Sequence, residues 1–179
     1  VIGDTVTAKI MKAKKNYGYG RLMEILKPSP YRVDPICPSA RQCGGCQLQA
    51  VSYEEQKAFK EKKLRGHLER IGGFKELPME PLIGMDEPYH YRNKAQFPVG
   101  RNKEGRIVTG FYAGRTHAII ENRDCALGIP QNKEVLDRVI AHMEKYNIAP
   151  YDEMTGKGLV RHIFVRYGFF TGELMVCLI

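Results

Sequence analysis

Residues 37–46 read CPSARQCGGC and place Cys37, Cys43 and Cys46, three of the chain's five cysteines, within ten positions. A group this tight is either a disulfide staple or a metal or cluster site. The sequence has no apolar run of the roughly 18 residues that a membrane span needs and no visible signal peptide, so we expect a cytoplasmic protein without a membrane partner. Thiols stay reduced in that compartment, and the group therefore favours metal or cluster binding over disulfides.

The spacing Cys-x5-Cys-x2-Cys does not identify the metal. Cys43 and Cys46 can chelate one metal or adjacent cluster irons, and the two glycines between them let the backbone fold tightly around sulfur. A fourth thiol could come from Cys125, which follows polar, turn-forming residues in ENRDCALG, whereas Cys177 lies in an apolar run and reads as a small core side chain. Tetrahedral zinc and a four-iron cluster both satisfy this pattern. A radical-generating cluster does not, because its motif has three residues between the first two cysteines.

On the N-terminal side of the cysteines, the sequence predicts part of a small barrel. The stretches VTAKIMKAK and YGRLMEIL alternate in hydropathy around the turn-like KNYGYG, which predicts two or three lysine-rich strands within residues 1–30. Four prolines in KPSPYRVDPICP then predict an extended linker. We therefore place the first domain over 1–30.

On the C-terminal side of the cysteines, the sequence predicts a helix. Ser52 precedes Glu55 by three residues, as in a capping box, and SYEEQKAFKEKKLRGHLERI continues to a stop at Gly72. Glu61 and Arg65 are spaced as an i,i+4 ion pair. The linker, the cysteine segment and this helix make up a second region over 31–75.

From residue 89 the hydrophobic period changes to two. The stretch YHYRNKAQFPV predicts a strand over 89–99 with aromatic and aliphatic side chains on one face. Its other face would carry His90, Arg92, Lys94 and Gln96. A row of cationic and amide side chains is typical of a phosphate-binding surface.

The remaining elements predict a sheet with one covering helix. A loop over 100–105 separates the strand from two more, in RIVTGFYA and THAIIE, and LVRHIFVRYG and ELMVCLI form a later strand pair. The intervening helix, over about 131–146, has core positions at helical spacing: Leu136, Val139, Ile140 and Met143. The expected fold class is α+β: an OB-like barrel remnant over 1–30, the cysteine segment with a helix over 31–75, and a mixed antiparallel sheet and helix domain over 76–179.

Charge points to a polyanionic partner. Lys and Arg total 28 against 20 Asp and Glu, a formal net charge of +8. Nucleic acid is the commonest partner for such an excess, and a basic surface that is only solvated is the alternative. Our candidate RNA contacts are Arg92, Lys94, Gln96, Arg115, Arg161 and Arg166.

The stretch SPYRVDPICPSARQCGGCQLQAVSYEEQKAFKEKKL resembles the cluster segment of bacterial uracil-5 RNA methyltransferases that modify 23S ribosomal RNA. The resemblance continues through YHYRNKAQFPVG and GFYAGRTHAIIENRDCALG, and the first strands resemble the closing part of a TRAM domain, a small RNA-binding barrel. It implies a structural 4Fe-4S cluster on Cys37, Cys43, Cys46 and Cys125, and 23S rRNA as partner. It also implies S-adenosylmethionine as methyl donor, bound in a Rossmann-like domain C-terminal to these residues.

The chain departs from that family pattern by what it lacks. We find no Gly-rich strand-turn-helix for the cofactor, no Asp-Pro-Pro loop and no nucleophile context around Cys177. Because the chain starts at Val1 and stops within ELMVCLI, we expect a piece of a longer enzyme that is monomeric and inactive alone. The rival readings are a zinc-stabilised RNA-binding module without a methyltransferase parent and an electron-transfer cluster protein. The second is disfavoured because nothing resembles a partner redox site. A tRNA substrate stays open.

Overall fold

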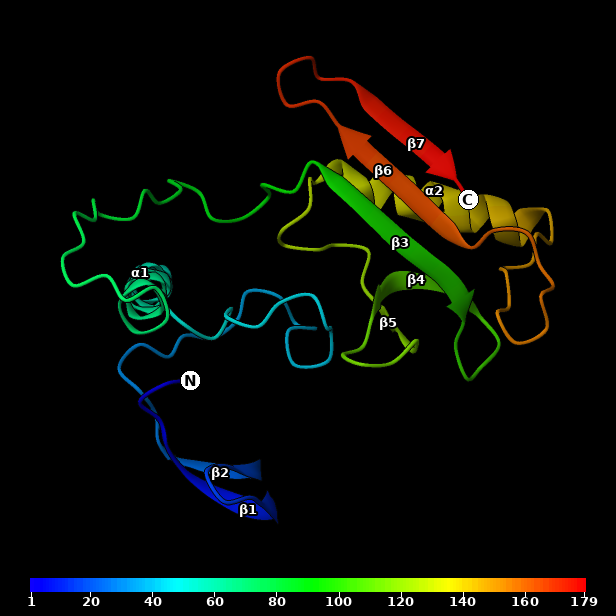
Figure 1. Ribbon diagram of the computed structural model, residues 1–179. Helices are drawn as coiled ribbons and strands as arrows, with labels where there is room; N and C mark the ends of the chain where they lie inside the picture. Colours follow the sequence, from blue (N-terminus) through cyan, green and yellow to red (C-terminus); the bar gives the residue numbers. More distant parts are fainter. The chain divides into compact units, whose positions relative to one another are not determined.

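A computed structural model describes residues 1–179 and separates them into two units (Figure 1). The first unit comprises Val1–Pro35 and Leu48–Gly84, and the second comprises Ile36–Gln47 and Met85–Ile179. The cysteine segment therefore belongs to the second unit, although the chain runs through it between two parts of the first.

The first unit contains an antiparallel hairpin of β1 (Thr5–Ala13) and β2 (Gly18–Lys27). This confirms two of the two or three strands predicted there. Three register shifts interrupt the pairing, and nearly every side chain of both strands is exposed. The hairpin thus has lysines and apolar side chains in solvent and no core of its own.

Helix α1 (Tyr53–Arg70) is the other element of the first unit. Ser52 is its N-cap residue as predicted, but its side chain makes no capping hydrogen bond, so the predicted capping box is wrong. The predicted ion pair is also wrong, because Arg65 lies 3.9 Å from Glu69 rather than pairing with Glu61. No residue of the helix is buried.

A carboxylate joins the start of the hairpin to the linker that follows it. Asp4 accepts hydrogen bonds from the Ser29 backbone N–H at 2.8 Å and from Arg32 Nε at 3.1 Å, and it forms an ion pair with the Arg32 guanidinium. Arg32 is the main reason that the pKa of Asp4 lies well below its usual range. The linker is therefore held at Arg32 rather than freely extended.

The second unit is built on a five-stranded antiparallel sheet with the strand order β5-β4-β3-β6-β7. The strands are β3 (Lys94–Arg101), β4 (Ile107–Tyr112), β5 (Ile119–Glu121), β6 (His162–Tyr167) and β7 (Leu174–Leu178). Helix α2 (Gln131–Lys145) connects the β5 side of the sheet to β6 in the sequence. The α+β class is confirmed.

Strand β3 begins later than the alternation predicts. The prediction of a strand from residue 89 is wrong for 89–93, because residues 90 and 92 pair with the chain near residue 127. Pairing with β6 begins only at Asn93, whose carbonyl accepts from the Tyr167 N–H at 2.8 Å. The His90 backbone N–H donates to Ala126 O at 3.0 Å, and Arg92 forms a parallel bridge with Gly128. His90 also has a positive φ of 52°, which a strand does not allow.

Helix α2 covers one face of the sheet (Figure 1) and supplies much of its core. Leu136, Ile140 and Met143 are at most 2% exposed and pack in one cluster with Phe97 and Ile163. Three of the four predicted core positions are thus buried, and Val139 packs partly buried against the same cluster. Neither helix has the length and apolar content that a bilayer crossing requires.

Strand β7 is the edge of this sheet and is exposed along its whole length. Cys177 is exposed, so its reading as a core side chain is wrong. Leu174, Val176 and Leu178 share the α2 side of the sheet with the buried β6 residues, yet each is at least 42% exposed. An apolar sequence alone does not bury an edge strand.

Candidate functional site

Three of the predicted RNA contacts lie together on the face of the sheet opposite α2. Lys94 and Gln96 alternate with core residues on β3, and Arg166 of β6 is the direct cross-strand partner of Lys94. All three side chains are exposed. Like charges directly opposite each other on a sheet are destabilising, so this pair carries a local electrostatic cost that a bound anion would relieve.

The same face continues along β6 with Phe164 and His162. Phe164 is paired with Gln96 and His162 with Pro98, and both ring side chains are half-buried. Burial and the nearby charge of Arg161 lower the pKa of His162. We call Lys94, Gln96, His162, Phe164 and Arg166 the basic sheet face.

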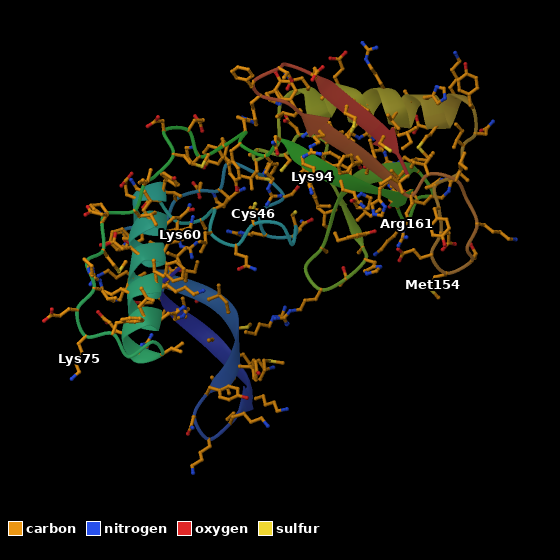
Figure 2. The ribbon with its side chains drawn as sticks, turned by 45° about the horizontal axis from the view of Figure 1, so that its top comes forward. Cys46, Lys60, Lys75, Lys94, Met154 and Arg161 are labelled. Carbon is orange, nitrogen blue, oxygen red and sulfur yellow. The ribbon has the colours of Figure 1, made fainter.

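The other three predicted contacts lie elsewhere in this unit. Arg92 is half-buried and precedes β3, and Arg115 is exposed in the loop after β4, with a φ of 63°. Arg161 precedes β6, where its carbonyl accepts from the Val99 N–H at 2.9 Å. Figure 2 labels Lys94 and Arg161, which the strand register places toward opposite ends of the β3–β6 pair.

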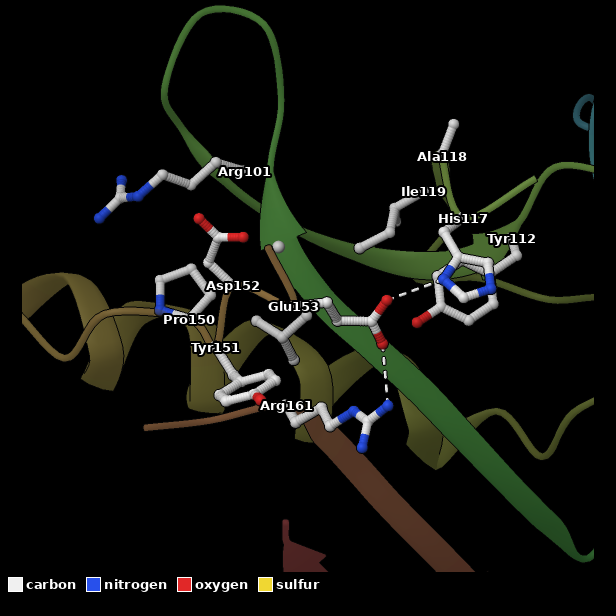
Figure 3. Close-up of a pocket in the computed structure, with 12 residues that line it drawn as sticks. Arg101, Tyr112, His117, Ala118, Ile119, Pro150, Tyr151, Asp152, Glu153 and Arg161 are labelled. Carbon is white, nitrogen blue, oxygen red and sulfur yellow. Dashed lines mark hydrogen bonds and ion pairs between the residues drawn. The ribbon is translucent and has the colours of Figure 1, made fainter. Parts of the chain in front are cut away.

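Arg161 lines a cleft that no pattern in the sequence predicts. The cleft, with a volume of about 470 Å³, lies between the β4–β5 loop and the segment around 150–153 (Figure 3). In its centre the Glu153 carboxylate bridges an imidazole and a guanidinium. One oxygen contacts His117 Nδ1 at 2.8 Å and the other accepts from Arg161 at 2.8 Å.

Aromatic rings line both walls of this cleft. The Tyr112 and His117 rings are stacked, with centroids 5.1 Å apart and an interplanar angle of 23°, and the Arg161 guanidinium lies 5.7 Å from the centroid of the Tyr151 ring. Burial, with a smaller effect of Glu153, raises the pKa of Tyr112. His117 and Arg161 lower the pKa of Glu153 and keep it ionised.

The cysteine segment packs against the end of β4. Cys43 forms an antiparallel bridge with Ala113, and the Gly44 N–H donates to Tyr112 O at 3.0 Å. A Cβ at Gly44 would lie 3.1 Å from two backbone atoms of Gly114. The glycine is required here by a close backbone approach, and it places the cysteines beside the β4–β5 loop.

Two of the four predicted ligand thiols accept hydrogen bonds from N–H groups. Asn122 Nδ2 lies 3.6 Å from Cys37 Sγ, and both residues are buried. The Gly45 N–H donates to Cys43 Sγ at 3.4 Å. Cys125 is half-buried in a turn, where its carbonyl accepts from Gly128 at 2.9 Å.

The donor set fits a metal or cluster by its chemistry, since thiols that accept N–H hydrogen bonds are the ligands of iron–sulfur clusters. Cys37, Cys43, Cys46 and Cys125 all belong to the second unit. The four thiols do not lie close enough together to form a metal site, because no three His, Cys, Asp or Glu side chains form a group that could hold a metal ion. The ligand assignment stays a prediction.

No protein-family profile matches the chain, but several bacterial proteins do. A Bacillus cereus protein named as an uncharacterized RNA methyltransferase is 45% identical over 177 residues, covering 99% of this chain and 38% of that protein. Proteins with the same description from Clostridium tetani and Staphylococcus aureus are 42% and 38% identical and cover 100% and 98% of this chain. The chain spans only 38% to 39% of these relatives.

A solved structure shares the fold. The Pyrococcus abyssi tRNA (uracil-54, C5)-methyltransferase, in complex with S-adenosyl-L-homocysteine, matches with a TM-score of 0.65 and 26% identity. The match covers 95% of this chain and 37% of that one. The chain is therefore similar, over nearly all of its own length, to one part of larger RNA methyltransferases.

Proposed function

We propose that residues 1–179 are the RNA-recognition and 4Fe-4S-binding part of an S-adenosylmethionine-dependent RNA (uracil-5-)-methyltransferase that acts on 23S rRNA. The observation that carries the proposal is the similarity to RNA methyltransferases over 99% of the chain. The matched structure supports uracil C5 as the target, because that enzyme modifies this position of a tRNA uracil. The choice of 23S rRNA rests on the resemblance of the cysteine segment, and we expect a cytoplasmic monomer.

The basic sheet face supports the RNA-binding role. Lys94 and Arg166 project from adjacent strands directly opposite each other, and no acidic side chain is paired with either of them in the structure. Two adjacent unneutralised cations bind the phosphates of an RNA strand and release its counterions. Half-buried Phe164 beside them adds an aromatic ring of the kind that stacks on unpaired bases.

The cysteines would hold the 4Fe-4S cluster through Cys37, Cys43, Cys46 and Cys125. When bound, the cluster supplies iron–thiolate bonds that cross-link separate segments of the chain. The residues around it already dock the first of these segments: Gly44 pairs with the end of β4, and Asn122 reaches Cys37. Four protein thiolates leave no open position, so we assign the site to fold stability rather than to chemistry.

Methyl transfer itself is assigned to the part of the enzyme outside residues 1–179. C5 methylation needs a covalent nucleophile, a methyl donor held close to it and a base. Cys177 is exposed, and its thiol donates a hydrogen bond to the Leu178 carbonyl at 3.9 Å rather than to a base. The Pyrococcus abyssi enzyme that was solved with S-adenosyl-L-homocysteine is much longer, and this chain matches only 37% of it.

The rival function is a zinc-stabilised RNA-binding module, and metal analysis separates the two. Anaerobically prepared protein should contain about four irons and matching sulfide per chain, as expected of a four-cysteine cubane. Cys125→Ser should lose iron, whereas Cys177→Ser, the matched control, should keep it. Zinc without iron or sulfide would support the module, and full clusters in both variants would refute the ligand assignment.

Binding to two transcripts tests the RNA partner. The protein should bind a 23S rRNA transcript more tightly than a tRNA transcript when the two are compared at the same ionic strength, because affinities at different salt are not comparable. Tighter binding to the tRNA would replace the proposed substrate and retain the RNA-binding role. No binding to either RNA at low salt would refute the role itself.

A further inference from the structure

We propose that His117 is a stacking platform for one unpaired base of the bound RNA strand. This inference rests on the proposed RNA-binding function and adds a base contact to a surface so far described only by its charges. The cleft around Glu153 belongs to the second unit and none of the resemblances assigns it a role.

The imidazole of His117 has one occupied face and one open face. Its occupied face stacks on Tyr112 with centroids 5.1 Å apart, while the side chain as a whole is 76% exposed. A base placed on the open face would extend an existing two-ring stack. Stacking of bases on aromatic side chains is the usual means by which proteins hold single-stranded RNA.

The ring is held in position before any ligand arrives. The Glu153 carboxylate, which only accepts hydrogen bonds, fixes the proton on Nδ1. The loop that carries the ring is closed by the Ala113 N–H donating to Ala118 O at 2.8 Å, and Thr116 Oγ1 accepts from the Ala118 N–H at 3.2 Å. A preorganised ring loses little conformational entropy on binding.

Each of the two clefts that His117 lines also contains an arginine. Tyr112 and His117 line two clefts, of about 470 and 500 Å³. Arg161 lines the first cleft and Arg115 lines the second. A strand that passes over His117 can therefore place its base on the ring and its phosphates near Arg115 and near Arg161, which in the free protein is paired with Glu153 at 2.8 Å. A free mononucleotide cannot reach both arginines.

The test compares two strands in the complete protein. One is an oligouridine of about twelve nucleotides, within the site sizes known for single-strand-binding folds; the other has the same length and phosphates but abasic sugars. The wild type should prefer the base-bearing strand. His117→Ala should reduce that preference by roughly 5- to 150-fold, the loss of one stacked base, without changing the salt slope.

His117→Phe is the matched variant, because it keeps an aromatic ring and removes the bond to Glu153. It should retain most of the wild-type preference. Loss of preference in both variants would show that the imidazole acts as a hydrogen-bonding group and would overturn the platform, as would an unchanged preference in His117→Ala.

Two further outcomes distinguish a failure of the RNA-binding function from a failure of the His117 platform. If neither strand binds the wild type, the proposed RNA-binding function fails, whereas failure of the His117 comparison alone leaves that function standing. Uridine monophosphate should bind far more weakly than the oligouridine, because it cannot reach both arginines. Equal affinity of the two would identify a nucleotide pocket and overturn the assignment to an RNA strand.

Discussion

Removing the opposed cations of the sheet, with Lys94→Ala and Arg166→Ala together, should weaken RNA binding and leave the fold intact or slightly more stable. The two residues are direct cross-strand partners and both are exposed. A like-charge pair in this position is unfavourable by a few tenths of a kcal/mol, up to about 1 kcal/mol. The double variant should therefore have a urea midpoint equal to or above that of the wild type.

The effect on RNA binding follows from counterion release. Each phosphate contact to a single strand contributes roughly 0.7 to the slope of log affinity against log salt, so the loss of two contacts should reduce the slope by about 1.4. Between 50 and 200 mM salt, the wild type should consequently lose about sevenfold more affinity than the double variant. Fluorescence anisotropy with a labelled single-stranded RNA across that series measures both slopes.

The matched control removes two cations from the helix on the opposite face of the sheet. Lys133 and Arg138 of α2 form ion pairs with Asp137 and Glu134, respectively, and their replacement by Ala should change the slope much less. Equal slopes for the wild type and the sheet variant would refute the phosphate-binding role. If the helix variant lost as much of the salt slope as the sheet variant, only the total charge of the protein would matter for RNA binding.

Two further predictions concern the second unit. Gly44→Ala should lower the urea midpoint and increase proteolysis near the cysteines more than Gly45→Ala does. The reason is that a Cβ at Gly44 would meet backbone atoms at 3.1–3.2 Å, whereas a Cβ at Gly45 would meet only a thiol at 3.4 Å. Equal effects of the two variants would contradict the docking of the cysteine segment on β4. His117 and Arg161 lower the pKa of Glu153 in the folded state, so its stabilisation is complete above the unfolded pKa of about 4.3 and is lost as the pH falls through the folded pKa. The stability difference between wild type and Glu153→Gln should accordingly shrink as the pH falls below about 4.3, and a difference independent of pH would contradict the ion-pair network.

Local periodicity was enough to predict the elements whose burial follows from one amphipathic pattern. The 3.6-residue period of α2 predicts its core positions because the helix lies flat on the sheet, and Leu136 and Ile140 are buried accordingly. The period of two continues through residues 89–93, but pairing of His90 and Arg92 with the chain near Gly128 overrides it. Such pairing between distant segments is not encoded in the alternation itself.

The sequence predicts only the part of the candidate site that lies on a single strand. Lys94 and Gln96 follow from alternation along β3, whereas the position of Arg166 opposite Lys94 depends on the register of β6. The His117–Glu153 contact joins residues 36 positions apart in the sequence, on two loops that carry no motif. Cys177 is likewise exposed because β7 lies at the sheet edge. The apolar residues around it in the sequence do not reveal this position.

The identity of the methylated nucleoside tests the proposed methyltransferase function most directly. The complete protein would be incubated with S-adenosylmethionine and a 23S rRNA transcript, with residues 1–179 alone in a parallel reaction. The digested RNA would then be analysed by mass spectrometry. We expect 5-methyluridine with the complete protein and no methylated nucleoside with residues 1–179. A methyl group on another base, or methyl transfer by residues 1–179 alone, would contradict this expectation.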